Sequence, residues 1–170
     1  MDLIEHFRML ARYNRIANET LFECCAGLNP GEYRKARQGS FGSIHGLLNH
    51  ILLGDRIWMA RFEGGGKTTP PLNTVLFDDF GELRAARAAE DARIEKFFGE
   101  ADTEFLAKRL DYANSRGVAC SEVAAIAVSH MFNHETHHRG QVHVMVSQTG
   151  AAAPSLDLHR IMAADQHYGR

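Results

Sequence analysis

Residues 130–141 read His-Met-Phe-Asn-His-Glu-Thr-His-His-Arg-Gly-Gln, which places four histidines within nine positions of one predicted helix. At about 100° per residue, His130 and His138 lie about 40° to either side of His134 around the helix axis. His137 lies about 60° from His134, on the same side as His130. The four imidazoles therefore share one side of this helix, and the rest of the chain must be arranged around them.

The side of the helix that carries the histidines is otherwise apolar. It also carries Ala127, Met131 and Met145, so it is predicted to face the core. A buried imidazole requires partners for its ring nitrogens, and several buried together indicate a metal ion rather than ordinary hydrogen bonds. His143 lies on the opposite side of the helix and is expected at the surface.

Length and composition indicate an ordinary globular protein. The chain has 170 residues, and residues 1–170 are predicted to form a single domain. Hydrophobic residues make up 45% of the chain and charged residues 24%. The net charge of −2 provides no broad basic surface, so no nucleic acid partner is expected.

The chain carries no sign of a membrane or secretory segment. No apolar run approaches the ~20 residues that span a bilayer, and the N-terminal segment lacks the apolar core of a signal peptide. Three cysteines, of which Cys24 and Cys25 are adjacent, do not form a disulfide framework. We therefore expect a cytoplasmic protein without membrane association, in which these thiols are structural.

Hydrophobic spacing predicts long helices at about 2–27, 43–63, 78–98 and 121–150, joined by short connections. Candidate N-caps of the last three are Ser43, Asp78 or Asp79, and Ser121. Shorter helices are expected at about 102–107 and 156–164, and residues 110–117 are expected to form an irregular loop or a weak extended pair. The fold class is therefore all-α, an antiparallel four-helix bundle with short additional helices.

Several histidine pairs in the fourth helix have the spacing of metal ligands. Residues one turn apart on a helix can share one metal ion. Three pairs qualify: His130 with His134, His134 with His138, and His134 with His137. Spacing alone leaves this choice open, and the imidazoles that do not bind would support the ligands or line the rim of the site.

A metal site with an open coordination position needs a third protein ligand, and His50 in the second helix is the best candidate. Gly46 and Gly54 lie one turn to either side of His50, which either allows close helix packing or leaves room for a ligand. Glu135 and Asp55 lie about 100° and about 140° from His134 and His50, respectively, around their helix axes. An all-histidine site, suited to zinc, nickel, copper or iron, is therefore favoured over one that contains a carboxylate.

Three stretches of this sequence resemble a known family. Residues 43–50, Ser-Ile-His-Gly-Leu-Leu-Asn-His, followed by Asp-Arg-Ile-Trp at 55–58, resemble the second helix of the DinB-like family. This family belongs to the DinB/YfiT superfamily of four-helix-bundle metalloenzymes. Residues 133–141 resemble its fourth-helix signature, the most specific part of the match, and residues 11–18 fit its first helix.

The resemblance implies a ligand set and a type of chemistry. By resemblance, the metal ligands are one histidine of the second helix and a His-x3-His pair of the fourth, which here are His50, His134 and His138. The ion would be one divalent transition metal, nickel or zinc, with positions left for water or substrate. Members of the family are typically homodimers and include thiol S-transferases and a mycothiol-dependent isomerase. A homodimer and a low-molecular-weight thiol as co-substrate are therefore expected.

We expect a metal-dependent enzyme that transfers a low-molecular-weight thiol to a small electrophilic molecule. His130 or His137 is a candidate proton relay, because imidazole titrates near neutral pH. Arg139 and Tyr112 are candidate substrate-binding residues, although a salt bridge between helices is the simpler role for Arg139. One alternative is a metal-dependent hydrolase, but the sequence offers no evident glutamate beside the histidines that could act as its general base. Another is a non-catalytic metal-binding stress protein whose ion is enclosed by four protein ligands.

Overall fold

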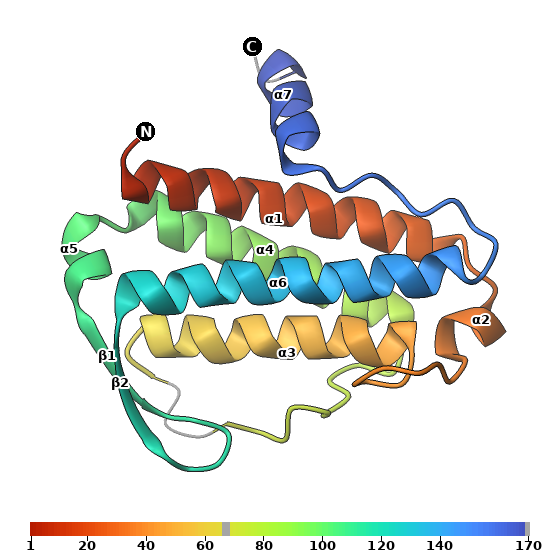
Figure 1. The fold of residues 1–170 in the computed structure, drawn as a ribbon, viewed down its shortest axis with the longest axis horizontal. Helices are drawn as coiled ribbons and strands as arrows, with labels where there is room; N and C mark the ends of the chain where they lie inside the picture. Colours follow the sequence, from red (N-terminus) through yellow and green to blue (C-terminus); the bar gives the residue numbers. More distant parts are fainter. Residues whose placement is uncertain (66–68, 169–170) are drawn as a thin grey trace.

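In the computed structural model, which describes residues 1–65 and 69–168, with side chains to residue 165, long helices pack side by side (Figure 1). The four long helices are α1 (Leu3–Ala26), α3 (Ile44–Phe62), α4 (Phe80–Glu100) and α6 (Ala124–Ser147). Helices α1 and α3 each pack against both α4 and α6. The expected helical bundle is therefore confirmed.

Short connections alone would make each long helix antiparallel to the one before it, but one pair of consecutive long helices departs from this pattern. Helix α1 runs antiparallel to α4, and α3 runs antiparallel to α6, but α3 and α4 run in the same direction (Figure 1). Residues 63–79 connect α3 to α4, and this long connection returns along the bundle, where a short one was expected. Its described part lies along α3, so its backbone can reach the side chains of that helix.

Helices α3 and α4 begin at capping residues that the sequence marks. Ser43 accepts a hydrogen bond from the backbone N–H of Gly46 at 3.0 Å. Asp79, rather than Asp78, accepts one from the backbone N–H of Glu82 at 2.9 Å. Such caps satisfy backbone donors that the first turn leaves free, so these two helix starts are fixed locally.

The start of α6 was predicted wrongly. Ser121 does not cap this helix, because it lies in strand β2 (Ala119–Val123), which pairs antiparallel with β1 (Arg109–Ala113). Helix α6 follows directly after Val123, and no side-chain hydrogen bond caps it. The region in which a loop or weak extended pair was expected is thus a β-hairpin that leads straight into the histidine helix.

Three short helices complete the described chain: α2 (Pro30–Arg34), α5 (Thr103–Ala107) and α7 (Leu158–Tyr168). Helices α5 and α7 correspond to the two short helices that the sequence predicts. Helix α2 was not predicted, although Asn29 caps it and proline occupies its first position, as is common at helix starts. Among the described residues, no helix combines the length and the apolar character that crossing a bilayer requires.

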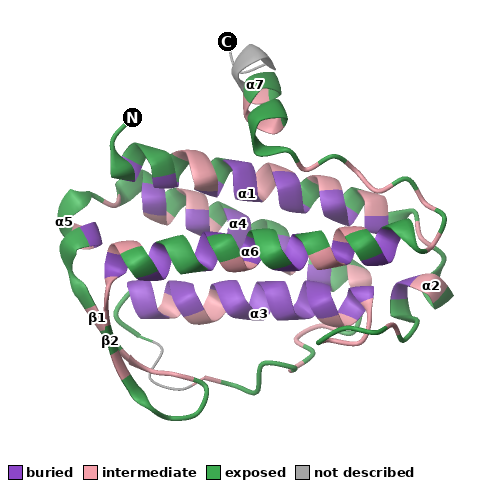
Figure 2. Ribbon diagram, viewed as in Figure 1, coloured by how far each residue is buried: buried purple, intermediate pink, exposed green. Residues whose placement is uncertain are grey.

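The core consists of two apolar clusters separated by a layer of polar side chains. Helix α3 is buried along most of its length (Figure 2). One cluster contains, among others, Phe7, Met59, Phe98, Met131 and Phe132. The other contains, among others, Leu21, Leu48, Leu83 and Val142. Between them along the helices lies the buried polar layer, made of Asn14, Asn18, Asp55, Arg87, Asp91, Glu135 and Arg139.

Candidate metal centre

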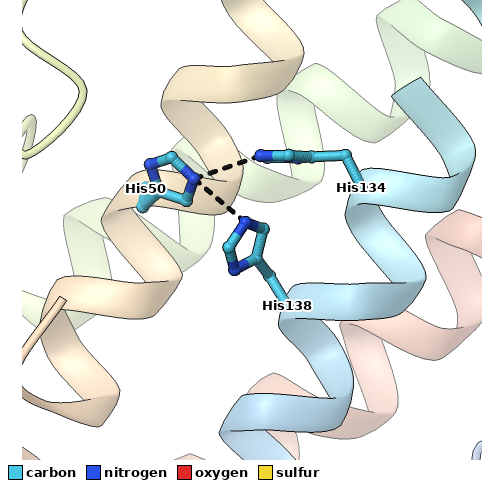
Figure 3. A group of neighbouring side chains, drawn as sticks. All are labelled: His50, His134 and His138. Carbon is cyan, nitrogen blue, oxygen red and sulfur yellow. Dashed lines mark hydrogen bonds between the residues drawn. The ribbon is translucent and has the colours of Figure 1, made fainter. Parts of the chain in front are cut away.

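Three imidazoles from two helices converge midway along the bundle. His50 of α3 faces His134 and His138 of α6 (Figure 3). The Nε2 atom of His50 lies 3.1 Å from Nε2 of His134 and 3.2 Å from Nε2 of His138. One ligand atom from each of the three side chains lies within 4.8 Å of the other two. Of the pairs that spacing left open, His134 with His138 is the one that meets His50.

The separation of these nitrogens fits a single divalent transition metal ion. Imidazole nitrogens bind such ions at about 2.0–2.1 Å. Two of them on one tetrahedral or octahedral ion are therefore about 2.8–3.4 Å apart. The distances from His50 to His134 and to His138 fall in that range.

Hydrogen bonds to the outer nitrogens fix the orientation of two imidazoles. The Nδ1 atom of His50 lies 2.9 Å from the carbonyl oxygen of Leu72, and Nδ1 of His138 lies 2.8 Å from Oε1 of Gln141. Both oxygens are acceptors, so each Nδ1 donates a proton and each Nε2 presents a lone pair to the cluster. Two lone pairs 3.2 Å apart repel each other unless a cation lies between them. The donor set therefore fits a metal ion.

Gly54 allows His134 to approach α3. A Cβ atom at Gly54 would lie 2.8 Å from Cε1 and 3.3 Å from Nδ1 of His134, which is closer than ordinary contact. Close packing, one of the two roles that the sequence left open for this glycine, is therefore observed. The contact is between an imidazole and the backbone of the facing helix.

Gly46, one turn before His50 on α3, serves the same site. A Cβ atom there would collide with the carbonyl oxygen of Phe41. The phenyl ring of Phe41 stacks on His50, with 3.6 Å between ring centroids and 17° between planes. Gly54 therefore makes room for an imidazole of the cluster, and Gly46 makes room for the backbone of Phe41, whose ring stacks on His50.

Burial keeps the three imidazoles neutral. Loss of hydration lowers the pKa of His50 to about 4 and that of His134 to about 3, and it also lowers the pKa of His138. The neighbouring imidazole of His138 further lowers the pKa of His50 and His134. Neutral imidazole is the form that binds metal ions, so these side chains are ready to bind at neutral pH.

An open pocket of about 230 Å³ adjoins the cluster. His50 and His134 line it together with Tyr112 and His130. Trp58 also lines it, with its ring centroid 5.5 Å from that of Tyr112 and 5.1 Å from that of His130. The structure thus brings two further predicted site residues, Tyr112 and His130, to the same pocket as two of the three clustered histidines.

Comparisons with known proteins agree with this architecture. The sequence profile of the DinB family matches residues 4–168. The chain belongs to the DinB family. Protein DinB of Bacillus subtilis is 29% identical over 158 residues, which cover 87% of this chain and 88% of the relative. The fold is similar to the crystal structure of a DinB-like protein from Bacillus subtilis, with a TM-score of 0.59 and 16% identity over 92% of this chain and 97% of that one.

Two other predicted site residues of this DinB family member lie outside the pocket. His137 is exposed, and its Nε2 lies 3.1 Å from the side-chain amide nitrogen of Gln141. Arg139 is only 2% exposed, and its guanidinium hydrogen-bonds Asn18 at 3.2 Å and Glu135 at 3.1 Å. The structure therefore places Arg139 in contacts between α6 and α1 and does not bring it to the pocket.

The carboxylates near the cluster in sequence belong to the buried polar layer. Arg87 forms ion pairs with Asp55 at 2.8 Å and with Asp91 at 3.0 Å, while Arg139 pairs with Glu135. Burial, followed by the charge of Asp55, raises the pKa of Glu135 well above its usual value. Three buried carboxyl groups thus face two guanidinium groups, and neither Asp55 nor Glu135 joins the histidine cluster.

Sequence reasoning missed several residues that shape the site. Leu72 contributes a backbone carbonyl, which no side-chain pattern reveals. Gln141 lies three residues after His138 on the same side of the helix, so its spacing could have indicated the hydrogen bond. Phe41 and Arg61 reach the site from a loop and from the far end of α3, and only the folded chain brings them there.

Proposed function

We propose that this DinB family member is a metal-dependent enzyme that transfers a low-molecular-weight thiol to an electrophile. The observation that carries the proposal is the convergence of three Nε2 atoms beside an open pocket. His50, His134 and His138 would hold one divalent ion, nickel or zinc by family resemblance. Such an ion supplies positive charge that lowers the pKa of a bound thiol. That the protein forms a homodimer is also a prediction from the family resemblance.

The number of protein ligands supports a reactive site over a closed structural one. A structural metal site usually has four protein ligands, and the fourth would here have to be His130 or His137. Neither belongs to the cluster found among the described residues. The His130 ring centroid lies 6.0 Å from that of His134, and His137 is bonded to Gln141. With three protein ligands, a coordination position is left for a molecule in the pocket.

Of the two candidates for proton relay, the pocket favours His130. His130 lines the pocket that His50 and His134 also line, and it is exposed to solvent. Its imidazole can accept the proton that a thiol loses there and pass it to water. His137 instead lines a separate hollow together with Gln141 and Gly39. We therefore assign His130 the relay role in this proposal.

The composition of the pocket disfavours the hydrolase alternative. Metal-assisted hydrolysis commonly uses a carboxylate to activate water beside the ion. Among the described residues that line the pocket there is no aspartate or glutamate. Glu135, the nearest glutamate in sequence to the ligand pair, is fully buried and pairs with Arg139. Transfer of a thiol requires no such base beyond an imidazole.

Metal analysis combined with a conjugation assay tests the proposal. Protein loaded with nickel or zinc is expected to accelerate the reaction of a thiol from a panel with chlorodinitrobenzene, and chelator-treated protein is not. His143→Ala is the control for histidine loss as such and is expected to keep the activity, because His143 lies on α6 outside the cluster. Loaded protein that accelerates no thiol conjugation, or that hydrolyses esters without added thiol, would contradict the proposed reaction.

A further inference from the structure

Arg61 is a buried cation that lines the pocket beside the histidine cluster. Its side chain is on α3, is only 7% exposed and lines the same pocket as His50 and His134. Its Nη2 atom donates to Oγ1 of Thr69 and to the carbonyl oxygen of Ala113, both at 3.1 Å. Both acceptors are neutral, so these bonds orient the guanidinium without balancing its charge.

Two aromatic rings hold the Arg61 guanidinium. Its central carbon lies 4.5 Å from the ring centroid of Trp58 and 4.1 Å from that of Tyr112. Such contacts engage the flat faces of the guanidinium and leave its N–H edge for hydrogen bonds. Arginine held in this way is well suited to bind a carboxylate through two parallel hydrogen bonds.

The charge of Arg61 has no ion-pair partner within the described chain. Glu122 is the carboxylate whose charge acts on it, but the two groups do not approach to ion-pair distance. Its Nε atom is buried and finds no hydrogen-bond acceptor among the described residues. Buried charges in proteins are usually paired, because removing them from water is costly. An unpaired buried cation that lines an open pocket therefore indicates an anionic ligand.

The distance between Arg61 and the histidines limits what that ligand can be. His50, Gly54, Trp58 and Arg61 follow each other along one side of α3 and all line the pocket. The backbone positions of His50 and Arg61 are about 16 Å apart along the helix axis, and the Arg61 side chain, which contacts Trp58, reaches back over part of that spacing. A ligand that contacts both Arg61 and the histidine cluster therefore needs its carboxylate several bonds away from its sulfur, as in a thiol of tripeptide size.

We propose that Arg61 binds a carboxylate of an elongated, anionic thiol co-substrate whose sulfur lies at the histidine end of the pocket. This inference rests on the proposed function and names the chemical class of its thiol. Arg61 is a positioning residue here, because it would hold the end of the co-substrate that does not react. Its charge selects acidic thiols over neutral ones of the same length.

The single tryptophan of the chain provides a direct test. Trp58 contacts Arg61, so its fluorescence reports on a ligand beside Arg61. We would titrate the metal-loaded protein with S-methylglutathione, which keeps both carboxylates but has a blocked sulfur, and with its diethyl ester. The acid is expected to bind at least about tenfold more tightly than the ester, because the charge-assisted hydrogen bonds to Arg61 require a carboxylate. Equal affinities, or no saturable change at millimolar acid, would overturn the inference.

Variants assign the effect to Arg61. Arg61→Gln is expected to remove the preference for the acid, and Arg61→Lys to keep part of it, because lysine retains the charge but not the planar fork. Arg56→Gln is the matched control, since Arg56 lies on the same helix, pairs with Glu90 and does not line the pocket. A preference that persists in folded Arg61→Gln would overturn the assignment. The blocked sulfur makes this result independent of thiol transfer, so each proposal can fail separately.

Discussion

Replacing Gly54 by alanine is expected to weaken metal binding and to leave the stability of the bundle nearly unchanged. The new Cβ atom would lie 2.8 Å from Cε1 of His134, so the imidazole must retreat by about 0.6 Å to reach ordinary contact at 3.4 Å. Metal–ligand distances tolerate deviations of only about 0.2 Å. We therefore expect Gly54→Ala to weaken metal binding by about 10- to 100-fold, the range seen when a ligand loses its support.

The same substitution is expected to leave the metal-free protein folded. Alanine is more favourable than glycine within a helix by about 1 kcal/mol. Overpacking costs about 1–3 kcal/mol, but His134 borders the pocket and can swing into it, which keeps the cost near the lower value. These two terms nearly cancel. The free energy of unfolding without metal is thus expected to stay within about 1 kcal/mol of wild type.

Gly140→Ala is the matched control for this prediction. Gly140 lies in α6 among the histidines, but a Cβ atom there would meet nothing within 4 Å. It should raise stability by about 1 kcal/mol and leave metal affinity unchanged. Affinity is measured by competition with a coloured chelator and stability by urea unfolding of metal-free protein. Wild-type affinity in Gly54→Ala would refute the close contact that positions His134.

Three further predictions concern the ligands, their support and the polar layer. His138→Ala should lose most bound metal in elemental analysis whereas His143→Ala retains it, and full occupancy in His138→Ala would exclude this ligand set. Gln141→Leu should weaken metal binding by about 10- to 100-fold in the chelator competition, because Nδ1 of His138 loses its acceptor; unchanged affinity would show that this hydrogen bond does not matter. Arg87→Met should lower the free energy of unfolding by about 3–5 kcal/mol, since it leaves buried carboxylates unpaired. Arg84→Met, which breaks only an exposed pair on the same helix, should cost at most about 1 kcal/mol in the same urea titration, and equal losses would contradict this view of the layer.

Much of the fold could be predicted because its signals are local. Ser43 and Asp79 cap their helices through bonds to residues only three positions away, so the sequence marks these starts. The start of α6 could not be predicted in the same way. Ser121 has the chemistry of a cap, but pairing with Asp111 across the hairpin places it in a strand. A contact between residues distant in sequence overrides local preference there.

In the candidate site, too, some features follow from local spacing and others depend on tertiary contacts. Helical periodicity placed His130, His134, His137 and His138 on one side of a helix, and His50 on the second helix was the best candidate for a third ligand, a role that the family resemblance also implied. The difference between His138 and His137, which lie side by side in sequence, is tertiary. His138 faces His50 and is buried, while His137 is exposed and bonded to Gln141. A rotation of about 100° between adjacent residues decides which one meets the facing helix.

The sequence by itself determined the bundle and the presence of a histidine cluster on its inner side, because both follow from periodicities within single helices. Only the tertiary structure decided which imidazoles converge, which backbone carbonyl orients His50, and that Arg139 stabilises the core. It also brought Arg61 and Tyr112 together beside the cluster. These contacts join segments far apart in the chain, so they depend on the return of the 63–79 connection and on the hairpin before α6.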